Sequence, residues 1–315
     1  MFVEDWAAAY GSPYLVKESD EANLAARLVE DGDELVLHPP PGDWSRDPVA
    51  FVDGVRRGEA ALSDLDPRTG ALARAVAGTH ACGAVAGEAS GRLCFDEVRV
   101  SRMLIWGSGV ERELPPVRGG WEWTARFIQD DAPDAPLKEL QSRMRQEEGL
   151  VAEEQAARGR LVIVDGPLNF VRSRDLPVVG YIKTHYRALL PPEKHRRIAD
   201  LKPMERTSMF SLGQDRYSCY LRLTPSTRLS GPWSGIVRLE IPQSTGLSVA
   251  VQTMNRVAAM IPRYAGVPHR DPRAPQNLQP VGALERELRH RMGDAGLAYR
   301  AVRAAVALSL QEVTR

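Results

Sequence analysis

The chain has 315 residues, and its 41 Lys and Arg balance its 41 Asp and Glu, so the formal net charge at pH 7 is zero. This balance excludes a globally basic nucleic-acid coat, and 43% hydrophobic with 26% charged residues is typical of a globular protein that buries a sizeable core. Apolar runs stay below the roughly 18 residues of a membrane span, and the first residues lack the pattern of a secretory leader. We therefore expect a cytoplasmic protein with no membrane partner.

The cysteines are odd in number and are not arranged in a CxxC spacing. They are Cys82, Cys94 and Cys219, each in an apolar or aromatic setting typical of a strand. This pattern predicts buried thiols and argues against a structural zinc site.

The first part of the chain reads as an appendage. Residues 21–30 have a short helical pattern, and a cluster of Pro and Gly follows at residues 38–48. We expect an N-terminal appendage over residues 1–47 and one main domain over residues 48–315. The domain opens with an apolar strand that ends in Asp53 and Gly54.

Strands and helices then alternate. Residues 71–106 predict a meander of strands, residues 137–158 carry apolar side chains at helical spacing, and residues 160–168 form an apolar strand ending in Asp165 and Gly166. Further strands are expected within residues 176–186, 216–223 and 235–242, and helices over residues 248–264 and 281–311, the last with a break at residues 292–296. The order predicts an α/β fold with a mixed β-sheet flanked by helices.

Two of these strands end in Asp-Gly. If the strands lie side by side, Asp53 and Asp165 come within a few ångströms of each other, and two carboxylates that close repel unless a cation lies between them. Carboxylate oxygens suit Mn²⁺ or Mg²⁺, and such a pair can hold two ions for phosphodiester hydrolysis. The alternative is structural, because Asp-Gly is a common turn dipeptide.

The helix before Asp165 offers a third carboxylate. Glu147 and Glu148 fall between the apolar positions Met144 and Val151, where an unpartnered charge is normally excluded. At least one is expected to face inward, with Glu148 preferred. The alternative is a solvated helix side.

Other candidate residues lie in the second half. His269 sits in a polar, Pro-rich segment and could complete a metal shell or relay a proton, or it could be a surface residue. Lys183 follows an apolar strand, at the edge expected for the two aspartates, and could bind a phosphate or orient water. The other histidines show no metal-ligand spacing.

A basic stretch follows Lys183. Its Lys and Arg side chains could contact a DNA backbone or form a solvated helix face. The stretch contains Lys183, Arg187, Lys194, Arg196, Arg197, Lys202 and Arg206. Phosphate-binding motifs of ATPases and dinucleotide enzymes are absent from the sequence, so any energy for translocation must come from a partner.

The ordered motifs resemble the NurA nuclease family. They are VDG near the start, MRQEEGL on the helix, LVIVDGPL, VGYIKTHY and the histidine segment VPHRDP, and together they cover residues 48–283. The resemblance implies an RNase H-like α/β fold, a homodimer, and dependence on Mn²⁺ or Mg²⁺. It also implies a role in DNA end resection or antiviral defence together with a HerA-like hexameric ATPase.

The resemblance also implies roles for particular residues. Asp53 and Asp165 correspond to the metal-binding carboxylates, Glu148 or Glu147 to the helix glutamate, and His269 to the C-terminal histidine. Lys183 stands where the family has a lysine after its next strand, which implies a role in the active site.

Three functions follow as hypotheses. The first is a divalent-metal-dependent DNA nuclease in which Asp53, Asp165, Glu148 and His269 bind metal. The second is a non-catalytic adaptor that docks on a HerA-like ATPase and regulates it. The third is an RNase H-like enzyme that cuts RNA or hybrids.

Overall fold

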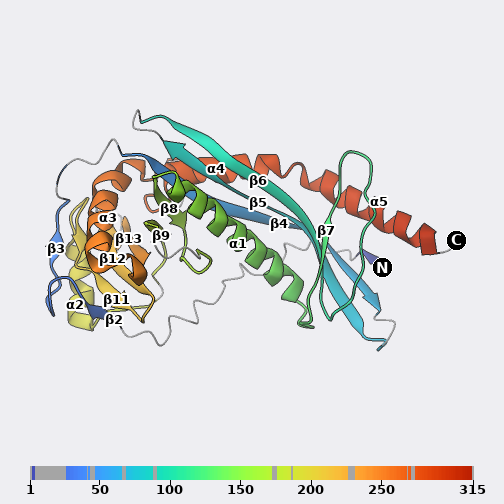
Figure 1. The fold of residues 1–315 in the computed structure, drawn as a ribbon, viewed down its shortest axis with the longest axis horizontal. Helices are drawn as coiled ribbons and strands as arrows, with labels where there is room; N and C mark the ends of the chain where they lie inside the picture. The colour runs from blue at the N-terminus through green and yellow to red at the C-terminus, as the bar shows by residue number, and fades with distance from the viewer. Residues whose placement is uncertain are drawn as a thin grey trace.

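The protein has a mixed α/β fold built on one mixed sheet (Figure 1). The computed structural model describes residues 2–3, 26–40, 42, 47–65, 69–87, 91–171, 176–185, 187–225, 231–267, 269–270 and 274–313. Along the sheet the strand order is β2-β11-β12-β13-β9-β8-β4-β5-β6-β7, with β1, β3 and β10 pairing beside this path. The predicted fold class is therefore confirmed at the level of a mixed α/β fold.

The elements follow in chain order. The strands are β1 (Phe2–Val3), β2 (Ala26–Leu28), β3 (Leu37–His38), β4 (Val49–Leu65), β5 (Leu72–Gly87), β6 (Leu93–Trp106), β7 (Thr124–Phe127), β8 (Leu161–Asp165), β9 (Val178–Ile182), β10 (Arg206–Thr207), β11 (Phe210–Leu212), β12 (Arg216–Arg222) and β13 (Ile236–Pro242). The helices are α1 (Ala135–Ala157), α2 (Pro192–Arg197), α3 (Leu247–Met260), α4 (Gln279–Arg291) and α5 (Ala295–Val313), with short 3₁₀ turns at Ile198–Asp200, Gln243–Thr245 and Ile261–Tyr264.

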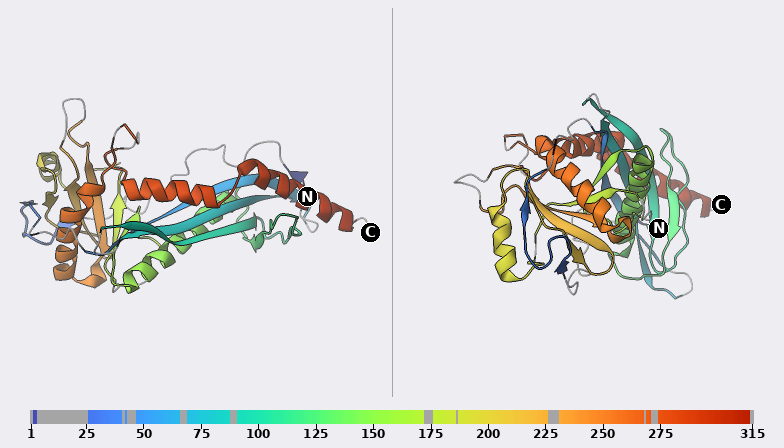
Figure 2. Two further views of the ribbon diagram at one scale, coloured as in Figure 1. Left: turned by 90° about the horizontal axis from the view of Figure 1, so that it is seen from above. Right: turned by 60° about the vertical axis from the view of Figure 1, so that its left-hand side comes forward.

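Three long strands dominate the middle of the molecule. β4 and β5 pair antiparallel from end to end, β6 pairs antiparallel with β5, and the short parallel strands β8 and β9 lie on the other side of β4. The predicted meander over residues 71–106 is thus confirmed as β5 and β6. Helices cover both faces, with α1 on one side of the long strands and α4 and α5 on the other (Figure 2).

Small side chains in β5 explain this close layering. The strand is rich in Ala and Gly and is almost entirely buried, because α1 packs on one of its faces and α4 on the other. In β4, Ala50 and Val52 belong to the core under α1, while Val55 belongs to the core under α4. Alternate side chains of one strand therefore serve two separate cores.

The described part of the predicted appendage belongs to the sheet. Residues 26–28 form a strand, so the predicted helix is wrong there, and residues 21–25 lie outside the described residues. β2 pairs with β11, β3 pairs with β10, and Glu30 accepts two hydrogen bonds of 2.7 Å from the buried Arg206 guanidinium. Pairing with a distant strand and one buried ion pair override the local helical pattern.

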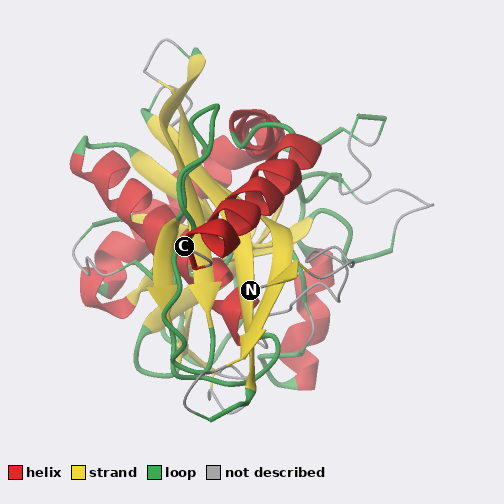
Figure 3. Ribbon diagram, turned by 90° about the vertical axis from the view of Figure 1, so that its right-hand side faces the viewer, coloured by secondary structure: helices red, strands yellow, loops and turns green. Residues whose placement is uncertain are grey.

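The termini of the described chain lie together. β1 pairs with the far end of β4, and α5 packs its buried side against the same long strands (Figure 3). Among the described helices, none combines the length and apolar character that crossing a membrane requires.

Gly149 fixes how the loop after β8 meets α1. It is buried in the middle of the helix, and a Cβ atom there would lie 2.5 Å from the carbonyl oxygen of Phe170. Backbone rather than a movable side chain fills that space. The helix can therefore approach the loop closely only because residue 149 has no side chain.

We expect Gly149→Ala to destabilise the protein, by about 1–3 kcal/mol for an overpacked site. Helix propensity alone predicts the opposite sign, because Ala is about 1 kcal/mol more favourable than Gly in a helix. Thermal unfolding followed by circular dichroism measures the change. The control is Gly296→Ala, at an exposed position of α5 whose nearest contact is a side-chain oxygen of Asp294 at 3.2 Å. An unchanged or raised Tm for Gly149→Ala would contradict this account.

Candidate functional site

The parallel pairing of β4 and β8 brings the two predicted aspartates together. Val52 lies opposite Val164, so the next residues, Asp53 and Asp165, come side by side where β8 ends. One carboxylate oxygen of each aspartate lies within 4.8 Å of the other and of a Glu285 oxygen. The predicted juxtaposition is therefore present in the structure.

The predicted turn after Asp53 is wrong. β4 continues to Leu65, because it pairs with β5 over its whole length. Gly54 instead allows close packing: a Cβ there would lie 2.9 Å from Met144 Cγ and 3.0 Å from Cys82 Sγ. Gly166 does provide a turn, since its φ of 119° lies in the region that favours glycine.

Glu285 is the site residue that the sequence reasoning missed. It lies on α4, next to the buried Leu284 and one helical turn after the buried Val281. The criterion that selected Glu148, a carboxylate adjoining an apolar stripe, could have found it. What the sequence did not show is that α4 packs over β4 and β5 on the face that carries Asp53.

Glu148 is buried, with 1% of its surface exposed, and it is the inward-facing glutamate of α1. Both of its oxygens accept hydrogen bonds from Nη1 of Arg145, at 3.0 and 2.7 Å. The same Nη1 also donates to the backbone oxygen of Asp165 at 3.1 Å. Arg145 thereby links the helix glutamate to the end of β8.

Lys183 and Asn277 complete the cluster. Lys183 Nζ donates to Asp165 Oδ2 at 2.6 Å and to Asn277 Oδ1 at 2.9 Å. Asp165 Oδ1, by contrast, is buried and has no hydrogen-bond partner within the described protein. An unsatisfied carboxylate oxygen in a cluster of carboxylates is the donor a divalent cation requires.

Burial and repulsion perturb the carboxylates. Burial, with added repulsion from Asp165 and Glu148, raises the pKa of Asp53 well above its usual range. Burial also raises the pKa of Glu148 to about 7, although Arg145 opposes the rise. Both shifts mean that the folded protein holds these negative charges at a cost, which a bound cation would offset.

The structure does not bring His269 into the cluster. It is exposed in a turn, and among the described residues it is not part of any group of possible metal ligands within 4.8 Å. Its role as a ligand stays a prediction.

The predicted basic surface is only partly available. Arg187, Arg196 and Arg197 are exposed and could meet a phosphate backbone. Arg206 is 1% exposed and its guanidinium is occupied by Glu30 and Asn255, so the prediction that it binds DNA is wrong. The physical reason is that Arg206 lies on β10, inside the sheet, where the charge needs a buried partner.

A hollow of about 510 Å³ lies beside β9 and β13, and its lining includes Gln276, the neighbour of Asn277 in the chain. His195 stacks on Trp233 with ring centroids 4.8 Å apart, and Arg187 lines the same space. Gln276, which precedes Asn277, also lines it and accepts a hydrogen bond from Tyr181 at 2.6 Å. The hollow is therefore linked to the cluster through the Gln276–Asn277 segment.

Comparison with protein-family models gives no match, and comparison with curated proteins gives none either. The resemblance to NurA nucleases consequently rests on the short ordered motifs.

The pKa shift of Glu148 makes stability depend on pH. Its folded pKa lies above its ordinary value of 4.5, so its contribution is fully present below about pH 4.5 and is lost as the pH rises through about 7. We expect Glu148→Gln to remove this pH-dependent loss of stability. With EDTA present, the Tm of the variant minus the Tm of the unmodified protein should therefore increase as the pH rises from 4.5 to 7. Glu122→Gln, at an exposed position, is the control. A difference in Tm that stays constant over this range would contradict the shift.

The geometry also predicts which residues bind Mn²⁺. In calorimetric titration, Asp165→Asn and Glu285→Gln should each weaken Mn²⁺ binding by roughly 10–100-fold or more. Losing a residue that only hydrogen-bonds a metal ligand already costs that much, and these residues would be direct ligands. His269→Ala should bind like the unmodified protein, because the exposed ring lies outside the cluster. Retained binding in Glu285→Gln together with loss in His269→Ala would reverse this assignment.

Proposed function

We propose that the protein is a divalent-metal-dependent DNA nuclease of the NurA type. The observation that carries the proposal is the convergence of Asp53, Asp165 and Glu285 within 4.8 Å, with one buried Asp165 oxygen left without a partner. Three carboxylates from β4, β8 and α4 are a hard donor set that fits Mn²⁺ or Mg²⁺.

Each residue then has a definite task. Asp53, Asp165 and Glu285 would hold a divalent ion, and Glu148 is the further carboxylate available to a second one. When bound, the ions supply positive charge that stabilises the attacking and leaving oxygens of the phosphodiester. Lys183 orients the Asp165 carboxylate through its 2.6 Å hydrogen bond, and its ammonium group would be available to a phosphate bound at the carboxylates. Arg145 holds Glu148 in position.

The neighbouring hollow suits a nucleic-acid strand. Stacked His195 and Trp233 offer a flat aromatic surface to a base, and Arg187 offers a charge to a phosphate. Base stacking on aromatic side chains combined with cationic backbone contacts is how proteins hold single strands without sequence preference.

The strand arrangement supports the RNase H-like part of the proposal. Strands β6-β5-β4-β8-β9 lie in that order, β4 is antiparallel to β5 and parallel to β8, and after β6 the chain adds β7 and then crosses one face as α1 before it enters β8. This is the order and direction expected for an RNase H-like core, with the first aspartate on its first strand.

The partners proposed from the resemblance are a HerA-like hexameric ATPase and a second copy of the chain, in DNA end resection or antiviral defence. Leu65 and Leu72, which pair at the far end of β4 and β5, are both exposed and offer apolar area to a partner.

Cleavage assays test the proposal. With Mn²⁺ and end-labelled single-stranded or duplex DNA we expect cleavage that EDTA abolishes and that Asp53→Asn or Asp165→Asn lowers by about 10²–10³-fold or more. Asp131→Asn, at an exposed position, is the matched control.

The outcomes separate the alternatives. Folded protein that cuts no substrate, with or without the ATPase, and binds no Mn²⁺ would favour the adaptor. Preferential cleavage of RNA or RNA–DNA hybrids would favour the third hypothesis.

A further inference from the structure

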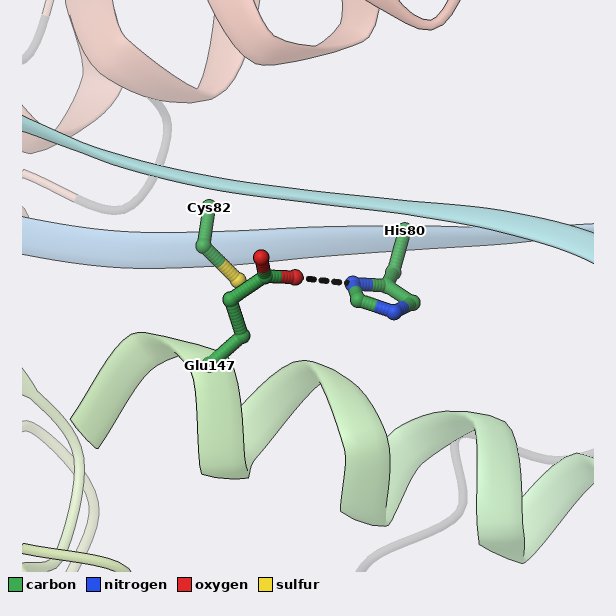
Figure 4. Close-up of side chains that lie close together, drawn as sticks. All are labelled: His80, Cys82 and Glu147. Atoms are coloured by element: carbon green, nitrogen blue, oxygen red, sulfur yellow. Dashed lines mark ion pairs between the residues drawn. The ribbon is translucent and has the colours of Figure 1, made fainter. Parts of the chain in front are cut away.

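A second cluster of side chains that can bind a metal lies between β5 and α1 (Figure 4). His80 and Cys82 are two residues apart on β5, so both side chains leave the same face of the strand, and Glu147 reaches them from α1. One ligand atom from each of the three lies within 4.8 Å of the others. We propose that these residues form a separate site for a borderline-soft divalent ion of the Zn²⁺ class, which ties α1 to β5.

The His80 ring is the observation that points to a ligand. The residue is 3% exposed, and its Nδ1 atom is buried with no hydrogen-bond partner within the described protein. Glu147 Oε2 lies 3.3 Å from that atom, but the geometry is not that of a hydrogen bond. The ring nitrogen therefore faces the Glu147 carboxylate, with which it forms an ion pair only when the imidazole is protonated, and it makes no hydrogen bond. A buried polar atom without a hydrogen bond is costly.

The remaining donors are close to a binding arrangement. Cys82 is fully buried, and its Sγ donates to the backbone oxygen of Met144 at 3.2 Å. Glu147 is partly exposed at the rim, where Oε2 also accepts from Ser101 Oγ at 3.4 Å. Binding would replace the Cys82 contact with Met144, and the thiol proton would leave to solvent as the thiolate coordinates.

The donor set selects the ion. A thiolate, an imidazole nitrogen and a carboxylate oxygen are the side chains that bind Zn²⁺, with water as a fourth ligand. Mn²⁺ and Mg²⁺ prefer oxygen donors, so they belong to the cluster of Asp53, Asp165 and Glu285. The two sites would thus sort their ions by ligand chemistry.

Metal binding at this second site would affect the cluster of Asp53, Asp165 and Glu285 through the backbone that the two sites share. Glu147 adjoins Glu148 on α1, and Cys82 lies opposite Gly54 of β4, the residue after Asp53. An ion bound to His80, Cys82 and Glu147 would clamp the helix that positions Glu148 onto the strand beside Asp53. The binding itself does not depend on the nuclease proposal.

Cobalt spectroscopy tests the site without any activity measurement. The protein is prepared as the Cys94→Ser/Cys219→Ser variant, in which Cys82 is the remaining thiol, freed of metal and titrated with Co²⁺. We expect a thiolate-to-cobalt charge-transfer band that Zn²⁺ abolishes by displacement and Mg²⁺ does not. His80→Gln and Glu147→Gln added to this background should weaken binding by roughly 10-fold or more. Asp165→Asn should leave the band unchanged.

A second measurement covers the case in which further substitution unfolds the protein. X-ray absorption of the Zn²⁺-loaded Cys94→Ser/Cys219→Ser variant should show a sulfur neighbour at about 2.3 Å. A folded protein with only nitrogen and oxygen neighbours would overturn the proposal, and so would a thiolate band of the otherwise unmodified protein that persists in Cys82→Ser. Loss of the band in Asp165→Asn would also overturn it, because the metal would then belong to the first cluster.

Discussion

The parallel pairing of β8 with β4 places two aspartates side by side in a largely buried position. Their negative charges repel each other, and several surrounding side chains partly neutralise them. Lys183 donates hydrogen bonds to one oxygen of Asp165 and to Asn277, while Arg145 donates to Glu148 and to the backbone at the end of β8. The positive charges of Lys183 and Arg145 do not fully offset burial and repulsion between the carboxylates, since the pKa values of Asp53 and Glu148 remain raised. The remaining electrostatic cost is the physical basis for expecting a divalent cation there.

The architecture that permits this site is a layering of helices on both faces of long, narrow strands. Ala and Gly in β5 keep the faces flat, so α1 and α4 approach closely and each contributes a carboxylate, Glu148 or Glu285. Gly149 allows the loop after β8 to lie against α1 at the level of Glu148. Backbone close approach therefore helps position the charged side chains.

The doubled glutamate on α1 takes two directions. Glu148 is buried toward Arg145 and Asp165, and Glu147 turns toward His80 on β5. Adjacent helical residues point about 100° apart, so one dipeptide can serve two clusters. The ambiguity between these residues in the sequence reflects two different environments around one turn of helix.

Local patterns in the sequence determined the mixed α/β class, the long helix α1 and the two C-terminal helices with their break, because these features depend on periodicity, which is a local property. The sequence also suggested that Asp53 and Asp165 meet, but β4 runs on to Leu65, so it is the parallel pairing with β8 that brings them together. Tertiary structure decided the rest. Glu285 joins the aspartates through packing of α4, Arg206 is buried by a strand from the N-terminal segment, and Cys94 is exposed although its neighbours are typical of a strand. His80, Cys82 and Glu147 meet only when β5 lies under α1. Contacts between residues distant in sequence depend on which face of a helix packs on which face of the sheet. The spacing of residues along the sequence does not show this.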